Sequence, residues 1–317
     1  MVSEMGLEPT WCEPYEPESY ASTNFATQTF YIDFIINKYI TYIFFYYNLV
    51  MLFDILNKKY KLYYFCTAIV KHCNLNCKYC DHFSPLADVE FKDVKQLEKE
   101  FKQIKKIIEL EKIGIMGGEP LLHPDLVQIL NTTKMIFPET QILLVTNGIL
   151  LDKLSDDFWI TCNRNKVGIL ISKLNIKINT DEIKKKIRQF NVMATYYGAD
   201  SNEYKKMYKP VLDLNGQQCI EEMHEKCWQN KGKCNYYENG KLYKCSIAGN
   251  IDSFNKFFGK NLEITKKDYI DIYKTNFRKI EEYFNNPIDF CRYCNLNAIK
   301  YDLDWEISKK DISEWTM

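Results

Sequence analysis

The stretch that decides the fold is residues 63–80, which read YYFCTAIVKHCNLNCKYC. Its first part, Tyr63–Val70, is a nearly continuous run of apolar, aromatic and β-branched residues, as expected of a strand buried on both faces. Its second part holds three cysteines with the spacing C-x3-C-x2-C, namely Cys73, Cys77 and Cys80. Soft thiolates select iron–sulfur clusters, zinc or copper, and three ligands leave one coordination position open. The stretch therefore predicts a metal centre that can do chemistry at the end of a buried strand.

Short apolar runs and helix-period segments alternate after this strand. The expected strands are Ile113–Met116, Ile142–Val145, Val167–Ile171 and Asn191–Tyr197, and the expected helices are Val94–Ile108, Leu126–Phe137, Asp156–Asn163 and Asp181–Phe190. This alternation predicts right-handed βαβ units and a parallel sheet, and hence the α/β class. Ligands bind at the carboxyl ends of such strands, where the sequence has Gly117-Gly118, Thr146-Asn147-Gly148 and Ser172.

The sequence changes character after about residue 205. Residues Asn235–Cys245 read NYYENGKLYKC, which predicts a hairpin with Asn239-Gly240 at its turn. A helix is expected at Thr275–Phe284, and the pair of cysteines in Cys291–Cys294 follows it. We therefore expect a second, smaller domain that is organised by cysteines.

Composition limits the class of protein. Hydrophobic residues make up 46% of the 317 residues, which indicates a globular chain, and the 42 basic residues balance the 42 acidic ones. Without a net positive charge, nucleic acid is not an expected partner. The twelve cysteines fit metal binding in the reducing cytoplasm better than a secreted disulfide framework. Four isolated ones are expected to act as small buried hydrophobes: Cys12, Cys66, Cys162 and Cys219.

The N-terminal region, residues 1–56, is expected to be a non-native, disordered or hydrophobic extension. Residues 29–53 are apolar, but Asp33 and Lys38 interrupt them, so a membrane span is marginal and membrane association is not expected. Residues 5–29 resemble the translation of the antisense strand of a transfer-RNA gene. If that is so, residues 1–50 extend the reading frame too far and translation starts at Met51. A membrane anchor or an amphipathic arm is the alternative.

The cysteine triad, with the aromatic Tyr79 directly before its last member, resembles the signature of the radical SAM superfamily. In that family three thiolates hold a [4Fe–4S] cluster, and the fourth iron binds the amino and carboxylate groups of S-adenosylmethionine (SAM). The aromatic packs against the adenine, and reductive cleavage of SAM yields a 5′-deoxyadenosyl radical. The resemblance implies a core domain over residues 60–204 that folds as a partial (β/α)6 barrel. A zinc site with His72 or His82 as fourth ligand is the alternative.

Three further motifs strengthen the resemblance. Gly117-Gly118-Glu119-Pro120 is similar to the family's GGEP motif, which binds the methionine amino group. Glycines permit close backbone approach, and a carboxylate suits an ammonium donor. The family also places cofactor contacts near Asn147 and, at the ribose, near Ser172. His123 is expected to have a role at the entry of a helix, and we identify no catalytic base.

The second cysteine group resembles the opening of the SPASM and twitch extensions of radical SAM enzymes. Twelve residues separate Cys227 from Gly240, and four more lead to Cys245, which fits the pattern C-x9–15-G-x4-C. Only Cys291 and Cys294 follow, so the shorter twitch domain, over residues 205–300, is the better match. The resemblance implies one auxiliary [4Fe–4S] cluster held by these four cysteines, with residues 301–317 as a tail. A zinc ribbon is the alternative, and Cys234 is a ligand, a spare cysteine or a group that faces substrate.

The resemblance implies an enzyme that takes a hydrogen atom from its substrate and then oxidises or modifies it. A sugar-like or other small molecule is favoured as substrate, and a flavodoxin or ferredoxin would supply electrons. A peptide-modifying radical SAM maturase is the first alternative. A non-catalytic iron–sulfur or zinc protein is the second.

Overall fold

The computed structural model describes residues 36–49, 58–197, 204–231 and 234–317. The chain divides into two units, residues 1–58 and residues 59–317. In the first unit, residues 36–49 form a helix. No helix in the described ranges is both long enough and apolar enough to cross a membrane. Cys12, Met51 and most of the expected N-terminal extension lie outside the described residues, and the domain boundary near residue 204 stays a prediction.

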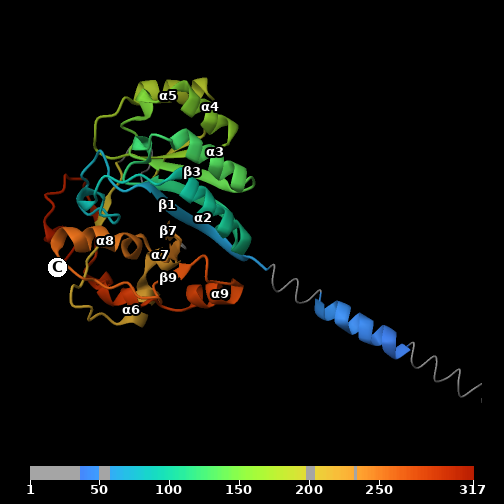
Figure 1. The fold of residues 1–317 in the computed structure, drawn as a ribbon. Helices are drawn as coiled ribbons and strands as arrows, with labels where there is room; N and C mark the ends of the chain where they lie inside the picture. The colour runs from blue at the N-terminus through green and yellow to red at the C-terminus, as the bar shows by residue number, and fades with distance from the viewer. Residues whose placement is uncertain (1–35, 50–57, 198–203, 232–233) are drawn as a thin grey trace, which may run out of the picture. The chain divides into compact units, whose positions relative to one another are not determined.

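An eight-stranded sheet forms the centre of the second unit, in the order β5-β4-β3-β2-β1-β7-β8-β9 (Figure 1). Its strands are β1 Tyr60–Val70, β2 Ile108–Gly117, β3 Gln141–Thr146, β4 Gly168–Ser172, β5 Ala194–Tyr197, β7 Asn235–Glu238, β8 Lys241–Tyr243 and β9 Tyr269–Asp271. Neighbours from β5 through β1 to β7 run parallel, and β8 and β9 are antiparallel. The predicted α/β class is confirmed. The described strands do not close a barrel, in keeping with a partial one.

Helices cover both faces of this sheet, and Figure 1 shows α2–α5 grouped along one side of it. The helices are α2 Val94–Ile107, α3 Leu126–Ile136, α4 Asp156–Arg164, α5 Thr180–Gln189, α6 Ile220–Lys226, α7 Trp228–Lys231, α8 Ser246–Phe258 and α9 Phe277–Asn285. One core lies between the sheet and α2–α5 with α9, and a second core contains α8. A separate two-stranded sheet pairs β6, Met207–Lys209, with β10, Lys300–Leu303.

Helix α2 illustrates how local sequence sets these elements. The Asp93 side chain caps its start by accepting a hydrogen bond from the Gln96 amide at 2.7 Å. Leu97, Phe101 and Ile104 recur at helical spacing and are buried against the sheet. Each contributes about 1.5–3 kcal/mol by leaving water. The cap and the apolar stripe together fix the helix beside β1 and β2.

Strand β2 is longer than the sequence predicted, since it begins at Ile108 instead of Ile113. Its first residues alternate between buried and exposed side chains, with Leu110 buried and Glu109 exposed. This is the pattern of a half-buried strand. It follows α2 without a loop, and Ile108 pairs with Tyr60 at the start of β1.

The predicted hairpin is present, and its first strand extends the main sheet. Strand β7 runs parallel to β1, and Cys66 lies opposite Tyr236. Asn239 and Gly240 have φ angles of 47° and 78°, as a primed turn requires. Because β7 lies next to β1, the hairpin that leads to Cys245 belongs to the same sheet as the strand that leads to the first cysteine loop.

The segment expected as a C-terminal tail packs against the core. Trp315 is fully buried and contacts the rings of Phe83 and Phe254. Its indole Nε1 donates a hydrogen bond to the carbonyl of Cys80 at 2.9 Å. The end of the chain is therefore attached to the first cysteine loop.

Candidate cofactor site

The first cysteine loop follows β1 directly and gathers three free thiols. The pKa of the Cys73 thiol is raised to about 12, mainly by burial, while a hydrogen bond from the Leu75 amide opposes the rise and the charges of Glu119, Cys77 and Cys80 add to it. Burial likewise raises the pKa of Cys80 to about 12. Such thiols are protonated at neutral pH, so a bound cation is needed to convert them to thiolate ligands.

Two glycines hold the GGEP loop against the cysteine loop. The Gly118 amide donates to the Val70 carbonyl at 2.8 Å, and the Glu119 amide donates to the His72 carbonyl at 3.1 Å. A Cβ atom on Gly117 would lie 2.1 Å from the Val70 oxygen, and one on Gly118 would lie 2.0 Å from the His72 oxygen. No side chain fits at either position, because the two backbones touch there.

Glu119 joins the ends of β2 and β3. Its carboxylate is fully buried and accepts hydrogen bonds from the Thr146 hydroxyl at 2.7 Å and the Asn147 amide at 2.9 Å. Burial raises its pKa to about 7, although these hydrogen bonds oppose the rise. The side chain therefore positions two of the predicted cofactor motifs relative to each other.

Asn147 extends this connection to the cysteine loop. Its side-chain amide donates to the Asn74 side-chain oxygen at 2.7 Å and to the Cys73 sulfur at 3.7 Å. Tyr79 has a left-handed φ of 66° within the loop, and Ser172 ends β4. Pro120 begins a short 3-10 helix after Glu119. All the predicted cofactor-binding residues thus lie on the loop or at the strand ends around it, and their contacts with SAM stay predictions.

The histidines of this region have structural partners. His123 Nδ1 accepts from the Asp125 amide at 3.0 Å just before α3, and Nε2 lies 2.9 Å from the Lys92 carbonyl. This geometry agrees with the expected helix-entry role. The rings of His72 and His82 pack edge-on against Phe91 and Tyr236.

The four cysteines of the second group line one pocket. Cys227, Cys245, Cys291 and Cys294 share its wall with apolar side chains and with the polar residues His224, Asn230 and Lys244. Burial raises the pKa of Cys245 strongly and that of Cys291 to about 11. The Cys245 sulfur caps α8 by accepting from the Ala248 amide at 3.4 Å, and a helix N-terminus favours a thiolate.

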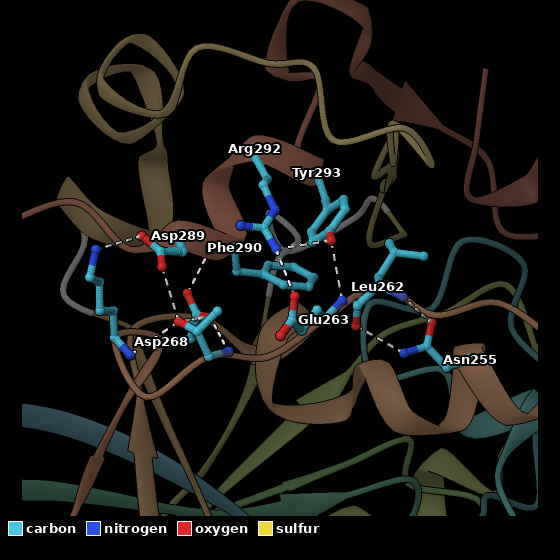
Figure 2. A network of polar contacts seen from close by, with 10 residues as sticks. Asn255, Leu262, Glu263, Asp268, Asp289, Phe290, Arg292 and Tyr293 are labelled. Carbon is cyan, nitrogen blue, oxygen red and sulfur yellow. Dashed lines mark hydrogen bonds and ion pairs between the residues drawn. The ribbon is translucent and has the colours of Figure 1, made fainter.

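A polar network fixes the segment that carries Cys291 and Cys294 (Figure 2). The Asp268 carboxylate accepts from the Phe290 amide at 2.6 Å. The Tyr293 hydroxyl accepts from the Glu263 amide at 3.2 Å, and the Arg292 guanidinium donates to the same hydroxyl at 3.1 Å. These contacts attach the two cysteines to the loop between α8 and β9.

Cys234 has a different neighbour. Its thiol interacts with that of Cys66, which is 3% exposed on β1, and this interaction raises the pKa of Cys66 and lowers that of Cys234. The Cys66 sulfur also donates to the Asn235 carbonyl at 3.3 Å. Cys66 is therefore buried as the sequence predicted, but it belongs to a pair of thiols that the sequence did not indicate.

Polar residues connect the two cysteine groups. Asp81 directly follows Cys80, and its Oδ2 accepts from the Tyr208 hydroxyl at 2.8 Å and the Ser246 hydroxyl at 3.2 Å. Ser246 in turn directly follows Cys245. The charges of Cys80 and Cys245 both act on Tyr208, whose pKa is raised well above its usual value, mainly by burial. A carboxylate and two hydroxyls thus link the two groups by hydrogen bonds.

Residues 68–192 match the family model described as the Radical SAM superfamily. The chain carries a radical SAM domain. Proteins of this family use a [4Fe–4S] cluster and SAM, so the match supports both predicted cofactors. Within the described residues, no three His, Cys, Asp or Glu side chains are grouped as ligands of a single metal ion. The three half-buried thiols of the first loop, and the four thiols that share a pocket, are of the kind that hold iron–sulfur clusters.

The radical SAM domain is also similar to curated GTP 3′,8-cyclases. The chain is 32% identical over 93 residues to the one from Microcystis aeruginosa, which is 28% of each chain. It is 32% identical over 138 residues to the one from Aliarcobacter butzleri, covering 42% of this chain and 40% of that one. The chain therefore spans less than half the length of these relatives.

Solved structures of similar shape include "BtrN in complex with AdoMet and 2-DOIA" and "Native anSMEcpe with bound AdoMet". The first has a TM-score of 0.45 and 14% identity, and it covers 75% of this chain and 94% of its own. The second has a TM-score of 0.43 and 11% identity, and it covers 73% of this chain and 89% of its own. At this level of similarity neither carries an argument about function.

Several residues near the radical SAM motifs were not predicted as site residues from the sequence. Asp81 and Ser246 could have been found because each directly follows a predicted ligand. Lys244 could have been found in the same way, because it directly precedes Cys245. Tyr208 and Trp305 carry no local signal, because the contacts that bring them to the cysteines join distant parts of the chain.

Proposed function

We propose that this chain is a radical SAM enzyme that takes a hydrogen atom from a small, sugar-like substrate and oxidises or modifies it with the help of a second iron–sulfur cluster. The observation that carries the proposal is the polar connection Tyr208–Asp81–Ser246 between the two cysteine groups. When bound, the first cluster and SAM supply a carbon radical that takes one hydrogen atom from the substrate.

The residues of the chain have separate tasks in this proposal. Cys73, Cys77 and Cys80 would hold the first cluster, and the loop at Gly117–Glu119 would position SAM beside it. Asp81 and the two hydroxyls would bind substrate hydroxyl groups, because carboxylates and hydroxyls are suitable hydrogen-bond partners for them. Removing a second electron from the substrate requires an acceptor, and the four-cysteine pocket is where it would be bound. A flavodoxin or ferredoxin in the cytoplasm would supply the electron for SAM cleavage.

A nucleotide is a second candidate for the substrate. The curated relatives are named for their action on GTP, and one observation favours an anionic substrate here. Tyr204, Lys205 and Lys206 line a pocket together with Trp305 and Asp304, and Asp304 pairs with Lys206 at 2.7 Å. The charge of Lys205 acts on Cys77. Lysine side chains attract phosphate groups. A peptide substrate has no comparable observation in its favour.

Anaerobic reconstitution tests the proposed activity. The protein is expected to bind two [4Fe–4S] clusters and to form 5′-deoxyadenosine from SAM and dithionite. Replacing Cys73, Cys77 and Cys80 together by alanine should abolish this product and leave one cluster. Cys219→Ala is the matched control, because Cys219 is exposed, contrary to the burial expected from the sequence. Bound zinc, or no reaction with SAM in the fully loaded protein, would overturn the proposal.

Substrate classes are separated by hydrogen transfer. Deuterated sugars, nucleoside triphosphates and peptides are each incubated with the enzyme and SAM, and 5′-deoxyadenosine is analysed for deuterium by mass spectrometry. Deuterium from the sugar-like compounds supports the first candidate, and deuterium from a nucleotide supports the second. Transfer from peptides alone would contradict both.

A further inference from the structure

We propose that the buried ammonium group of Lys244 compensates the negative charge of the four-cysteine site and raises the reduction potential of the cluster bound there. The inference rests on the proposed function, because it assumes an auxiliary cluster. The residue to which it assigns a role, Lys244, lines the pocket of the second cysteine group and makes no contact with the first.

Lys244 is held rigidly at the wall of the pocket. It directly precedes Cys245 and is 4% exposed. Its Nζ donates hydrogen bonds to the carbonyl of Phe284, at 3.2 Å, and to the carbonyl of Asn286. It also lies 5.3 Å from the centre of the Tyr283 ring. These groups are at the C-terminal end of α9, where the helix dipole favours a cation.

The backbone of Lys244 is anchored to the same place. Its amide donates to the Tyr283 hydroxyl at 3.0 Å, and that hydroxyl donates to the Asp268 carbonyl at 2.9 Å. Asp268 also holds Phe290, next to Cys291, through its carboxylate. The lysine and the cysteine pair therefore share one rigid support, so the ammonium cannot easily move away from the pocket.

The partners of the ammonium leave its charge uncompensated. Carbonyls and an aromatic ring are neutral, and no carboxylate in the described parts of the chain pairs with Lys244. Burying a cation without a counter-charge is strongly unfavourable. Burial lowers the pKa of Lys244 to about 8, and the charges of Cys291 and Cys227 in the same pocket oppose this fall. The lysine thus fits a pocket whose cysteines are thiolates bound to a metal centre.

A fixed cation changes the redox properties of such a centre. A cysteine-ligated cluster gains one negative charge on reduction, and a nearby ammonium stabilises the more negative state. The effect is strong because the site is buried and poorly screened by water. Lys244 therefore makes the cluster a better acceptor for an electron from the substrate.

The test uses the full chain with Cys73, Cys77 and Cys80 replaced by alanine, so that only the auxiliary cluster gives a signal. Its midpoint potential is measured by a redox titration followed by electron paramagnetic resonance. Lys244→Met should shift the potential to a more negative value by about 59 mV, which is about a tenfold change for a one-electron couple. Lys244→Arg should keep the parent potential. Lys241→Met, in the same hairpin but with its ammonium over the Tyr269 ring, is the control and should not shift it.

The possible outcomes distinguish the inference about Lys244 from the proposed function on which it rests. An unchanged potential in Lys244→Met, with the cluster bound, overturns the inference and leaves the proposed function intact. If Lys244→Met loses the cluster while Lys244→Arg keeps it, the requirement for a charge is supported. If both variants lose it, the lysine serves packing and the inference fails. If the parent with three alanines binds no [4Fe–4S] cluster, the auxiliary-cluster part of the proposed function fails first.

Discussion

Trp305 donates a hydrogen bond from its indole Nε1 to the sulfur of Cys77 at 3.1 Å. The surrounding backbone supports this contact, because the Lys78 amide donates to the Glu306 carbonyl at 2.9 Å and the Ser308 amide donates to the Asn76 carbonyl at 2.7 Å. The C-terminal segment thus forms one wall of the first cysteine loop. Hydrogen bonds to the sulfurs are one of the means by which a protein sets the potential of an iron–sulfur cluster.

Trp305→Phe is expected to retain the first cluster but to lower its reduction potential. Loss of one hydrogen bond is worth about 1 kcal/mol, or about fivefold in the ratio of reduced to oxidised cluster. Formation of 5′-deoxyadenosine with a limiting reductant should slow accordingly. Trp228→Phe, at an exposed tryptophan, is the control. Equal rates for both variants would show that the indole hydrogen bond has no redox role.

Trp315→Ala is expected to destabilise the protein by about 3–5 kcal/mol, as is typical for truncation of a buried large side chain. Trp315 is fully buried between Phe254 and Phe258. Urea unfolding of the metal-free protein measures the change. Trp228→Ala, where the side chain is 42% exposed, should cost much less. A similar loss in both variants would mean that the C-terminal segment is not part of the core.

The sequence predicted those helices and strands whose formation depends on residues close together in the chain. The strands and helices of the radical SAM domain have hydrophobic patterns with the right period, and the two glycines of GGEP mark a close backbone contact that the structure contains. The α8 helix was missed, although Ile247, Ile251 and Phe254 recur at helical spacing and are buried on one face. The aromatic and polar residues between them obscured that pattern.

Contacts between distant parts of the chain could not be predicted in the same way. The pairing of β7 with β1 joins residues far apart in sequence, and nothing in Asn235–Glu238 specifies its partner strand. The same is true of Trp305, which is identified only by where the C-terminal segment folds. These pairings bring the two cysteine groups together, so the residues between the groups could not be predicted from the sequence.

Gly118→Ala is expected to displace the GGEP loop from the cysteine loop, because its Cβ would lie 2.0 Å from the His72 carbonyl oxygen. Iron content after reconstitution should fall to about half, as the auxiliary site is untouched, and 5′-deoxyadenosine should not form. Gly168→Ala is the matched control, because its Cβ would meet the end of the Leu143 side chain at 3.1 Å, which can adjust. Full iron content and normal activity in Gly118→Ala would contradict the expected clash.

The last prediction concerns the dependence of stability on pH. Burial raises the pKa of Glu119 from 4.5 to about 7, so between these values the folded protein binds a proton that the unfolded chain releases. The free energy of unfolding of the metal-free protein should therefore fall as pH rises from about 4.5 to about 7, by roughly 3 kcal/mol from this group. Glu119→Gln cannot titrate, so urea unfolding at several pH values should show a smaller decrease for this variant. Identical slopes for the two proteins would mean that the Glu119 carboxyl keeps its ordinary pKa in the fold, and that its hydrogen bonds to Thr146 and Asn147 offset the cost of its burial.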